Sequence, residues 1–441
     1  MALIVIVLFG TLFVAFALGL YVAVALGMTS MTVGMLFTDK PILGFFAYIP
    51  WTLTSNVTFA VVPLFLLMGE LLLRSGATDT IYEALSKWMN RLPGGLLHTN
   101  IGACGVFSAI SGSSVATATT ISAVSLPSMR AYGYHQGLAL GSLAAGGTLG
   151  ILIPPSITMI IYGLLAEVSI GKLYIAGVLP GLLMMGCFMA VIVVLAKVRP
   201  EMAPQPDAAT VTWADRIRSL FNLLPVFVLI FLVLGTIYLG IGTAMEAAGF
   251  GVCGAFVYAL ANKKVNLPML RACFLGTAST TAMGALILIG AFLLQNLLAI
   301  LGLPIMLSRW VTGLGLSPFE LILVLCVIYL ILGMVMDAFA VMVTTLPIVA
   351  PMLFALDVDM VWFGIVMVIM IELGMITPPV GINLFVLQGV RMRDPNAPPG
   401  RGILDVYMGA LPFVVAMLVC LALILAFPQI AVWLVGTADF T

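Results

Sequence analysis

The chain contains the same short motif twice, and the two copies lie about half a chain apart. Gly150–Pro155, with the sequence GILIPP, returns as Gly374–Pro379, with the sequence GMITPP, 224 residues later. Three further pairs keep the same order and nearly the same spacing: Leu85–Trp88 with Leu307–Trp310, Thr119-Thr120 with Thr344-Thr345, and Leu179-Pro180 with Leu411-Pro412. The sequence therefore predicts two related halves. Each contains an apolar segment interrupted by Gly and Pro, a pattern typical of transporters with a binding site between their repeats.

The composition predicts that the chain lies in a membrane. Hydrophobic residues make up 63% of the sequence and charged residues only 8%, and the formal net charge is zero. Soluble monomers do not expose so much apolar surface, whereas stretches of about 20 apolar residues suit membrane-spanning helices. The six cysteines lie in apolar segments without paired spacing, which favours buried thiols over disulfides or transition-metal ligands. We therefore expect an all-α polytopic membrane protein.

Apolar runs and polar breaks divide the chain into two repeats joined by a linker. The first repeat is expected over 1–197, the cytoplasmic linker over 198–218, and an extra span with the second repeat over 219–441. The first repeat is expected to contain scaffold spans at 2–27 and 43–73, an interfacial arm helix at 77–91, a hairpin at 96–129, a broken helix at 134–165 and a span at 173–197. After spans near 219–240, 243–262 and 271–301, the second repeat is expected to contain an arm at 303–315, a hairpin at 318–357, a broken helix at 360–390 and a final span at 405–435.

Lysine and arginine in the short loops predict the orientation of the spans. Basic residues are concentrated around 74–91, 197–218, 263–271 and 391–401, which places these loops in the cytoplasm. The loops alternate correctly only if 96–129 and 318–357 each enter and leave the membrane on one face. Both are therefore expected to be re-entrant hairpins that open to opposite sides, so the repeats have inverted topology. The N-terminus is predicted to be cytoplasmic and the C-terminus periplasmic.

Two hairpin tips and two Pro-Pro breaks give four places with irregular backbone at membrane depth. Such backbone is tolerated where it lines a cavity or is buried in protein, and its carbonyls and helix ends can bind small ions. The polar and flexible residues at the first tip and the first break are Ser111, Gly112, Ser113, Ser114, Gly147, Thr148 and Gly150. Hard oxygen ligands without a sulfur or imidazole cluster suit sodium better than a transition metal. The alternative is close helix packing, which serine and glycine also mediate.

Two carboxylates lie inside apolar segments of the second half. Asp337 belongs to the second hairpin tip, and Glu372 precedes the second Pro-Pro break. Each is predicted to hold a cation or to carry a proton, because an unpaired charge in hydrocarbon is costly. The alternative is that Asp337 caps a half-helix and that Glu372 faces a wet crevice.

Other polar residues of these segments are candidates for contact with a solute. Asn383 is expected either to line the same cavity or to bond a neighbouring helix. Thr117, Thr344 and Thr345 are expected to form a polar stripe that faces the solute. The alternative is that these threonines bond their own helix backbone, as threonine often does.

The chain lacks the residue combinations of an enzyme. Ala109–Gly112 is close to the Gly-x-Ser-Gly motif of rhomboid proteases, but a serine nucleophile needs a base within hydrogen-bond reach. Both histidines, His98 and His135, are expected near the membrane edges. The sequence has no Gly-x-x-x-x-Gly-Lys motif to hold a nucleotide phosphate, so the chain is not expected to hydrolyse ATP.

Two runs carry a family resemblance, Gly146–Ser156 and Ile170–Gly181. They resemble the large membrane subunit (M subunit) of TRAP transporters, the tripartite ATP-independent periplasmic transporters. Ser111–Thr117, Met336-Asp337 and Ile376–Asn383 extend the resemblance over essentially the whole chain. One departure is Ala244-Met245, where the family usually has Pro-Thr before the glutamate; it affects a turn of the scaffold.

The resemblance implies an elevator-type transporter of the bacterial inner membrane, related to the ion transporter superfamily. Such a protein imports a small organic acid together with sodium ions; a dicarboxylate, a sugar acid and a keto acid are all compatible. It implies two partners: a periplasmic substrate-binding protein (P-type) and a small four-helix membrane subunit (Q-type). A stand-alone carboxylate or ion carrier of the same broad fold and, less favoured, a channel-like membrane protein stay open as alternatives.

The resemblance also implies positions for the sites. One sodium site would combine Ser111–Ser114 with Gly147–Gly150. The symmetric site would combine the following residues of the second half: Met336, Asp337, Gly374, Thr377 and Pro378. The substrate carboxylate would lie between the two tips, near Ser113, Thr117 and Thr344.

Overall fold

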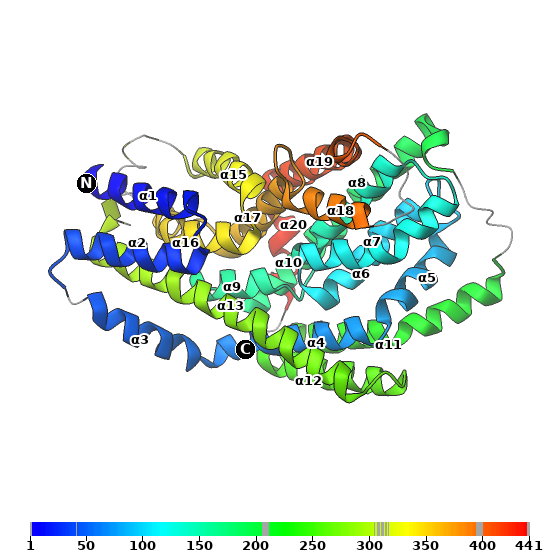
Figure 1. Ribbon diagram of the computed structural model, residues 1–441, viewed down its shortest axis with the longest axis horizontal. Coiled ribbons are helices and arrows are strands. Elements are labelled where there is room, and N and C mark those ends of the chain that lie inside the picture. The colour runs from blue at the N-terminus through cyan, green and yellow to red at the C-terminus, as the bar shows by residue number, and fades with distance from the viewer. Residues whose placement is uncertain are drawn as a thin grey trace.

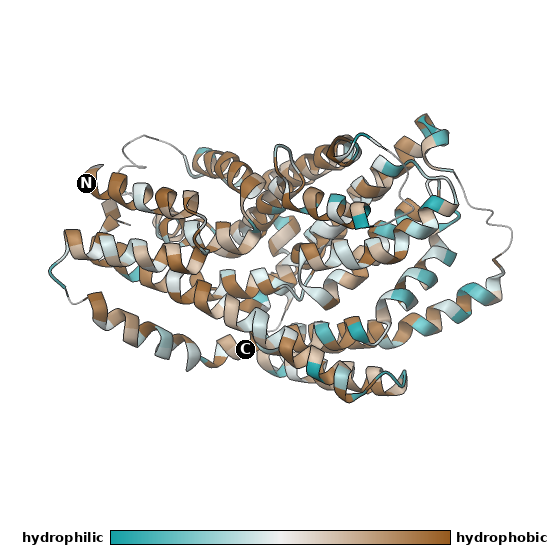
Figure 2. Ribbon diagram, viewed as in Figure 1, coloured by the Kyte–Doolittle hydropathy of each residue, from teal (hydrophilic) through white to brown (hydrophobic). Residues whose placement is uncertain are grey.

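The computed structural model describes residues 2–40, 42–204, 211–303, 317–393 and 400–438, with a few single positions between 305 and 315. Every regular element in these residues is helical, and seven of the described helices are long and apolar enough to cross a membrane. They form an elongated bundle with the N-terminus at one end (Figure 1). Hydrophobic residues follow the helices, while hydrophilic residues collect at helix ends and connections (Figure 2). The predicted all-α membrane fold is confirmed.

The expected single span at 2–27 is two helices instead. α1 covers Ala2–Ala17 and α2 covers Val22–Phe37. Gly19 lies between them with a φ of 72°, in the left-handed region that glycine adopts without steric cost. The apolar run continues through this turn, so hydropathy alone could not locate the break.

The expected span at 43–73 is also divided. α3 covers Ile42–Thr54, and the short helix η1 (Val57–Ala60) leads directly into α4 (Val61–Arg74). Asn56 starts the second part, because its side chain accepts a hydrogen bond from the Thr58 amide at 2.9 Å. Only the part from Val57 to Arg74 has the length and hydropathy of a membrane span.

The predicted interfacial arm is α5, Ala77–Met89, and it packs on α11, Trp213–Tyr238. The Trp88 indole donates a hydrogen bond to the Arg216 carbonyl at 3.3 Å. Because Thr212 and Asp215 form a capping box, α11 begins at 213 and not at the expected 219. α12 (Ala244–Ala261) and α13 (Leu267–Ile300) follow, while most of the second predicted arm, 303–315, lies outside the described residues.

Both predicted hairpins are present. The first consists of α6 (Leu96–Ser111) and α7 (Ser114–Ala131), and the second of α15 (Pro318–Val335) and α16 (Ala338–Phe354). Gly112 makes the first turn with a φ of 58°, which favours glycine. Each turn leads into a helix whose N-cap side chain accepts a backbone hydrogen bond.

Both predicted broken helices are present as well. The first consists of α8 (Gln136–Leu152) and α9 (Ile157–Leu165), which are bent by 42° at Pro154-Pro155. The second consists of α17 (Met360–Met375) and α18 (Ile382–Arg393), on either side of Pro378-Pro379. Proline lacks the backbone N–H that a continuing helix needs, so both helices end at these residues.

Each broken helix leads into a closing span. α10 covers Ile170–Val198 and is followed by a short turn, η2, at Pro200–Met202. α19 covers Ile403–Ala426 and ends earlier than the expected 435. Pro428 follows this end, and the remaining residues form two short helices, α20 (Gln429–Val432) and η4 (Val435–Thr437).

The packing repeats the sequence duplication. α8 packs against α6 and α19, and its counterpart α17 packs against α15 and α10. The second helix of each hairpin packs on the broken helix of the other half: α7 packs on α18, and α16 packs on α9. Each hairpin therefore contacts the broken helices of both halves. α8 and α19 approach closely, because Gly141 and Gly409 bring the two backbones into direct contact.

Candidate functional site

The first hairpin tip lies directly against the first break. A Cβ atom on Gly150 would stand 2.6 Å from the Ser113 carbonyl oxygen, and one on Gly147 would stand 2.8 Å from the Ala118 Cβ. A Cβ on Gly112 would stand 3.0 Å from the Pro155 carbonyl oxygen. These glycines let the irregular backbone of the tip approach the end of α8. The structure thus brings together the residues that the sequence assigned to the first sodium site.

The hydroxyl groups at this tip point in different directions. The hydroxyl oxygens of Ser111 and Thr117, which lie on the two helices of the hairpin, are 2.6 Å apart. Ser113 caps α7 by accepting a hydrogen bond from the Ala116 amide at 3.4 Å. Thr148 is buried and donates its hydroxyl hydrogen to the Ala145 carbonyl of its own helix. Ser111 and Thr117 therefore pair with each other, Ser113 caps its own helix, and Thr148 bonds only the backbone of its own helix.

Ser114 connects the first hairpin to the second half of the chain. Its hydroxyl donates to Glu372 Oε2 at 2.9 Å and accepts from Asn383 Nδ2 at 2.6 Å. The three residues lie on α7, α17 and α18, and each is at most 1% exposed. All three residues are candidates predicted from the sequence, but their contact with one another is not predicted by it. Nothing in the sequence signals a contact across more than 250 positions, apart from the presence of an acid inside an apolar helix.

The second hairpin tip also packs against a helix break, but its turn contains Met336 and Asp337 where the first tip has serines. A Cβ on Gly374 would stand 2.7 Å from the Gly333 Cα, so α15 and α17 touch through glycine. The Gly381 amide donates to the Met334 carbonyl at 3.0 Å, which ties the second break to the end of α15. Met336 is half-buried in the turn between α15 and α16.

Asp337 occupies the N-cap of α16. Its side chain accepts a hydrogen bond from the Ala340 amide at 3.1 Å, and the residue is exposed. Asp337 lies 224 positions after Ser113, which caps α7 in the first half. This capping hydrogen bond uses one of the two carboxylate oxygens of Asp337. Thr377 donates its hydroxyl to the Leu373 carbonyl at 2.6 Å, and Pro378 is exposed at the break.

The predicted threonine stripe is divided between two places. Thr117 pairs with Ser111 at the first tip. Thr345 donates to the Tyr329 hydroxyl at 3.2 Å and to its own helix, while the buried Thr344 hydroxyl has no hydrogen-bond partner among the described residues. Among the described residues no hydrogen bond joins the two groups, so the threonines do not form one continuous stripe.

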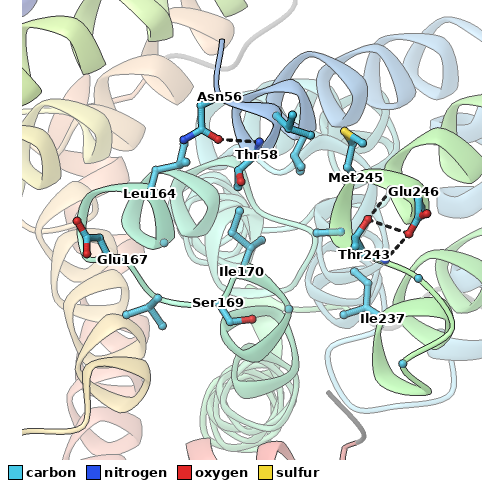
Figure 3. Close-up of a pocket in the computed structure, with 18 of the residues that line it drawn as sticks. Asn56, Thr58, Leu164, Glu167, Ser169, Ile170, Ile237, Thr243, Met245 and Glu246 are labelled. Atoms are coloured by element: carbon cyan, nitrogen blue, oxygen red, sulfur yellow. Dashed lines mark hydrogen bonds between the residues drawn. The ribbon is translucent and has the colours of Figure 1, made fainter. Parts of the chain in front are cut away.

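A cavity of about 960 Å³ lies away from the hairpin tips. It is bounded by the start of α4, the connection between α9 and α10, and the connection between α11 and α12 (Figure 3). Its polar wall contains Asn56, Glu167, Ser169 and the hydrogen-bonded pair Thr243 and Glu246. This cavity could not be predicted from the sequence, because its wall comes from three separate connections.

The donor set at the tips suits a hard monovalent cation. Hydroxyl, amide, carboxylate and backbone oxygens gather there, and no group of three or more His, Cys, Asp or Glu side chains occurs among the described residues. Oxygen ligands of this kind bind alkali and alkaline-earth ions, whereas transition metals select imidazole and thiolate. These oxygens are the kind of ligand that a hard cation prefers.

Comparison with known proteins identifies the family. Residues 9–430 match the family described as tripartite ATP-independent periplasmic transporter, DctM component. The chain is 35% identical over 380 residues to the C4-dicarboxylate TRAP transporter large permease protein DctM of Pseudomonas aeruginosa, with 86% of each chain covered. It is 30% identical over 428 residues to the sialic acid TRAP transporter large permease protein SiaM of Vibrio cholerae, covering 96% of this chain and 94% of that one.

Two further similarities extend this result. The chain is 32% identical over 385 residues to the isethionate TRAP transporter permease protein DctMQ of Oleidesulfovibrio alaskensis, covering 87% of this chain and 60% of that one. Its fold is similar to that of the YdaH transporter of Alcanivorax borkumensis, with a TM-score of 0.64, 17% identity and coverage of 95% and 98%. The chain therefore belongs to the DctM family of TRAP transporters, and it is a multi-pass membrane transport component rather than an enzyme.

Proposed function

We propose that this protein is the large permease of a sodium-coupled transporter that imports a small organic acid across the bacterial inner membrane. Relatives are named for C4-dicarboxylates, sialic acid and isethionate. These three solutes share an anionic carboxylate or sulfonate group. A small organic anion is therefore the substrate class that the relatives support best.

The observation that carries the proposal is the meeting of each hairpin tip with a helix break. At the first tip, Gly112 lies against the Pro-Pro break and Ser113 lies against the end of α8, whose last carbonyls have no helical partner. Helix C-termini attract cations. Sodium would bind there and, at the second tip, near Met336, Asp337, Gly374 and Thr377.

The substrate anion would lie between the tips. The N-termini of α7 and α16 begin at Ser113 and Asp337, and helix N-termini attract anions. Thr117, Thr344 and Thr345 supply hydroxyl groups on the same two helices. Asn383 binds Ser114 instead, which supports a role in holding the tip over direct contact with the substrate.

The movement would be of the elevator type. The hairpins and broken helices contact each other across both halves, which supports their moving together. The remaining spans, including α4, α11, α12 and α13, would form the scaffold. A periplasmic binding protein would deliver the solute, and a small membrane subunit would complete the complex. The name DctMQ of one relative supports a partner of the Q type.

The test is uptake into vesicles that contain the purified permease. A binding protein and a small subunit encoded beside this permease would be added to supply the full complex. We expect uptake of an organic acid against its gradient only with an inward sodium gradient and with both partners. Uptake by the permease alone would support a stand-alone carrier, and flux that never exceeds equilibrium would support a channel.

A further inference from the structure

The structure assigns Glu372 and Asn383 as ligands of an alkali cation that binds beside Ser114, in a site built from both halves of the chain. This inference rests on the proposed sodium coupling and goes beyond it, because it places the charged ligand of the first site on the opposite repeat.

Two buried oxygens of the cluster have no partner. Glu372 Oε2 and Asn383 Nδ2 both bond the Ser114 hydroxyl, which brings the two side-chain ends together. Their other oxygens, Glu372 Oε1 and Asn383 Oδ1, have no hydrogen-bond partner among the described residues. Buried polar atoms in folded proteins are rarely left without a partner. A small cation between these oxygens would satisfy both.

The charge of the Glu372 carboxylate also supports a bound cation. Glu372 makes no ion pair with a described residue and lies three positions before the end of α17. The C-terminus of that helix adds partial negative charge, while the N-terminus of α7, at Ser114, offsets a part of it. The two helix ends oppose each other. A buried carboxylate of this kind is neutralised by a proton or by a bound cation, and the sodium titration below distinguishes the two.

The ligands fit an alkali ion and not a transition metal. Carboxylate, amide and hydroxyl oxygens are hard ligands, and no sulfur or imidazole joins the three side chains. One carboxylate balances one positive charge. A monovalent ion is therefore matched by this site, whereas a divalent ion would be left with an excess positive charge in an apolar region.

The site has no equivalent in the other half. The residue 224 positions before Glu372 is Thr148, and the residue 224 positions after Ser114 is Ala338. A carboxylate and a hydroxyl are thus replaced by a neutral residue and an apolar one. The two sodium sites are then unequal, and the first is completed only when α17 and α18 reach the tip of the first hairpin.

The experiment compares sodium binding by three purified variants with that of the wild type. Glu372→Gln keeps the shape of the side chain and removes its charge, and Asn383→Leu removes the amide oxygen. The control is Glu83→Gln, because the Glu83 side chain is 70% exposed and forms only an i,i+4 pair with Lys87. Each protein is melted in increasing sodium chloride and in choline chloride of equal ionic strength. Sodium that binds the folded state raises the melting temperature.

We expect the sodium concentration for half-maximal stabilisation to rise about tenfold or more in Glu372→Gln and in Asn383→Leu, and to stay unchanged in Glu83→Gln. The melting temperature in choline shows whether each variant is folded. A folded variant at either position with an unchanged sodium dependence would overturn the assignment. A wild type that sodium fails to stabilise would overturn the proposed sodium coupling itself, which is a different result.

Discussion

Gly150→Ala tests whether the contact between the first tip and the first break positions ion ligands. A methyl group at position 150 would stand 2.6 Å from the Ser113 carbonyl oxygen and 2.9 Å from the Ser114 Cα. Both neighbours are backbone atoms, so the tip itself has to shift. Overpacking of this kind costs about 1–3 kcal/mol, and replacing glycine by alanine in a helix returns about 1 kcal/mol.

The net effect on stability is therefore small, a loss of about 0–2 kcal/mol. Sodium affinity should fall more than the stability of the fold, because a shift of the tip moves the backbone around Ser113 and the Ser114 hydroxyl together. We expect about a tenfold weaker sodium response, which corresponds to about 1.4 kcal/mol. The assay is sodium-dependent melting of the purified protein, followed by the sodium dependence of uptake in vesicles.

Gly186→Ala is the matched control. Gly186 lies in α10, and a Cβ there would meet no atom within 4 Å. It gives the helix-propensity gain without the clash, so its sodium response should equal that of the wild type. The reasoning is refuted if Gly150→Ala matches Gly186→Ala in both melting temperature and sodium half-saturation.

Three further predictions concern the other half, the cap and the helix contact. Asp337→Asn should keep the cap of α16, since asparagine caps as well as aspartate, yet weaken the sodium dependence of uptake about tenfold; unchanged sodium activation would remove Asp337 from the site. Ser113→Ala should lower stability by about 0.5–2 kcal/mol through loss of the α7 cap and also weaken sodium binding, and an intact affinity in a titration would leave it a structural role only. Gly409→Ala should sharply reduce the yield of folded protein, since its methyl would overlap the Gly137 carbonyl; a normal yield, equal to that of Gly249→Ala in open space, would contradict this.

The hairpins and breaks could be predicted from the sequence because their signals are local. Pro154-Pro155 and Pro378-Pro379 stop helices by their own chemistry, and Gly112 permits the turn that follows α6. Because the sequence is duplicated, a hairpin or break found in one half could also be predicted at the matching position of the other half. The division of the first span at Gly19 was missed because a single glycine in a long apolar run does not change its hydropathy.

The composition of the site could be predicted only in part. Ser114, Glu372 and Asn383 were identified as polar residues in apolar segments, but their contact depends on how α7, α17 and α18 pack. Two interpretations of Asp337 and Glu372 were left open by the sequence. The structure supports the cap for Asp337 and places Glu372 in a buried contact instead of a wet crevice, because the first hairpin covers it.

The glycine contact between α8 and α19 limits where the protein can bend. Gly137 and Gly141 face Gly409 without any side chain between the two main chains. Because main chain packs directly on main chain here, no change of side-chain rotamer can create space between the two helices. The last membrane helix is thus fastened to the helix that ends at the first break. If the protein moves by the proposed elevator mechanism, this contact supports placing α8 and α19 in the same part.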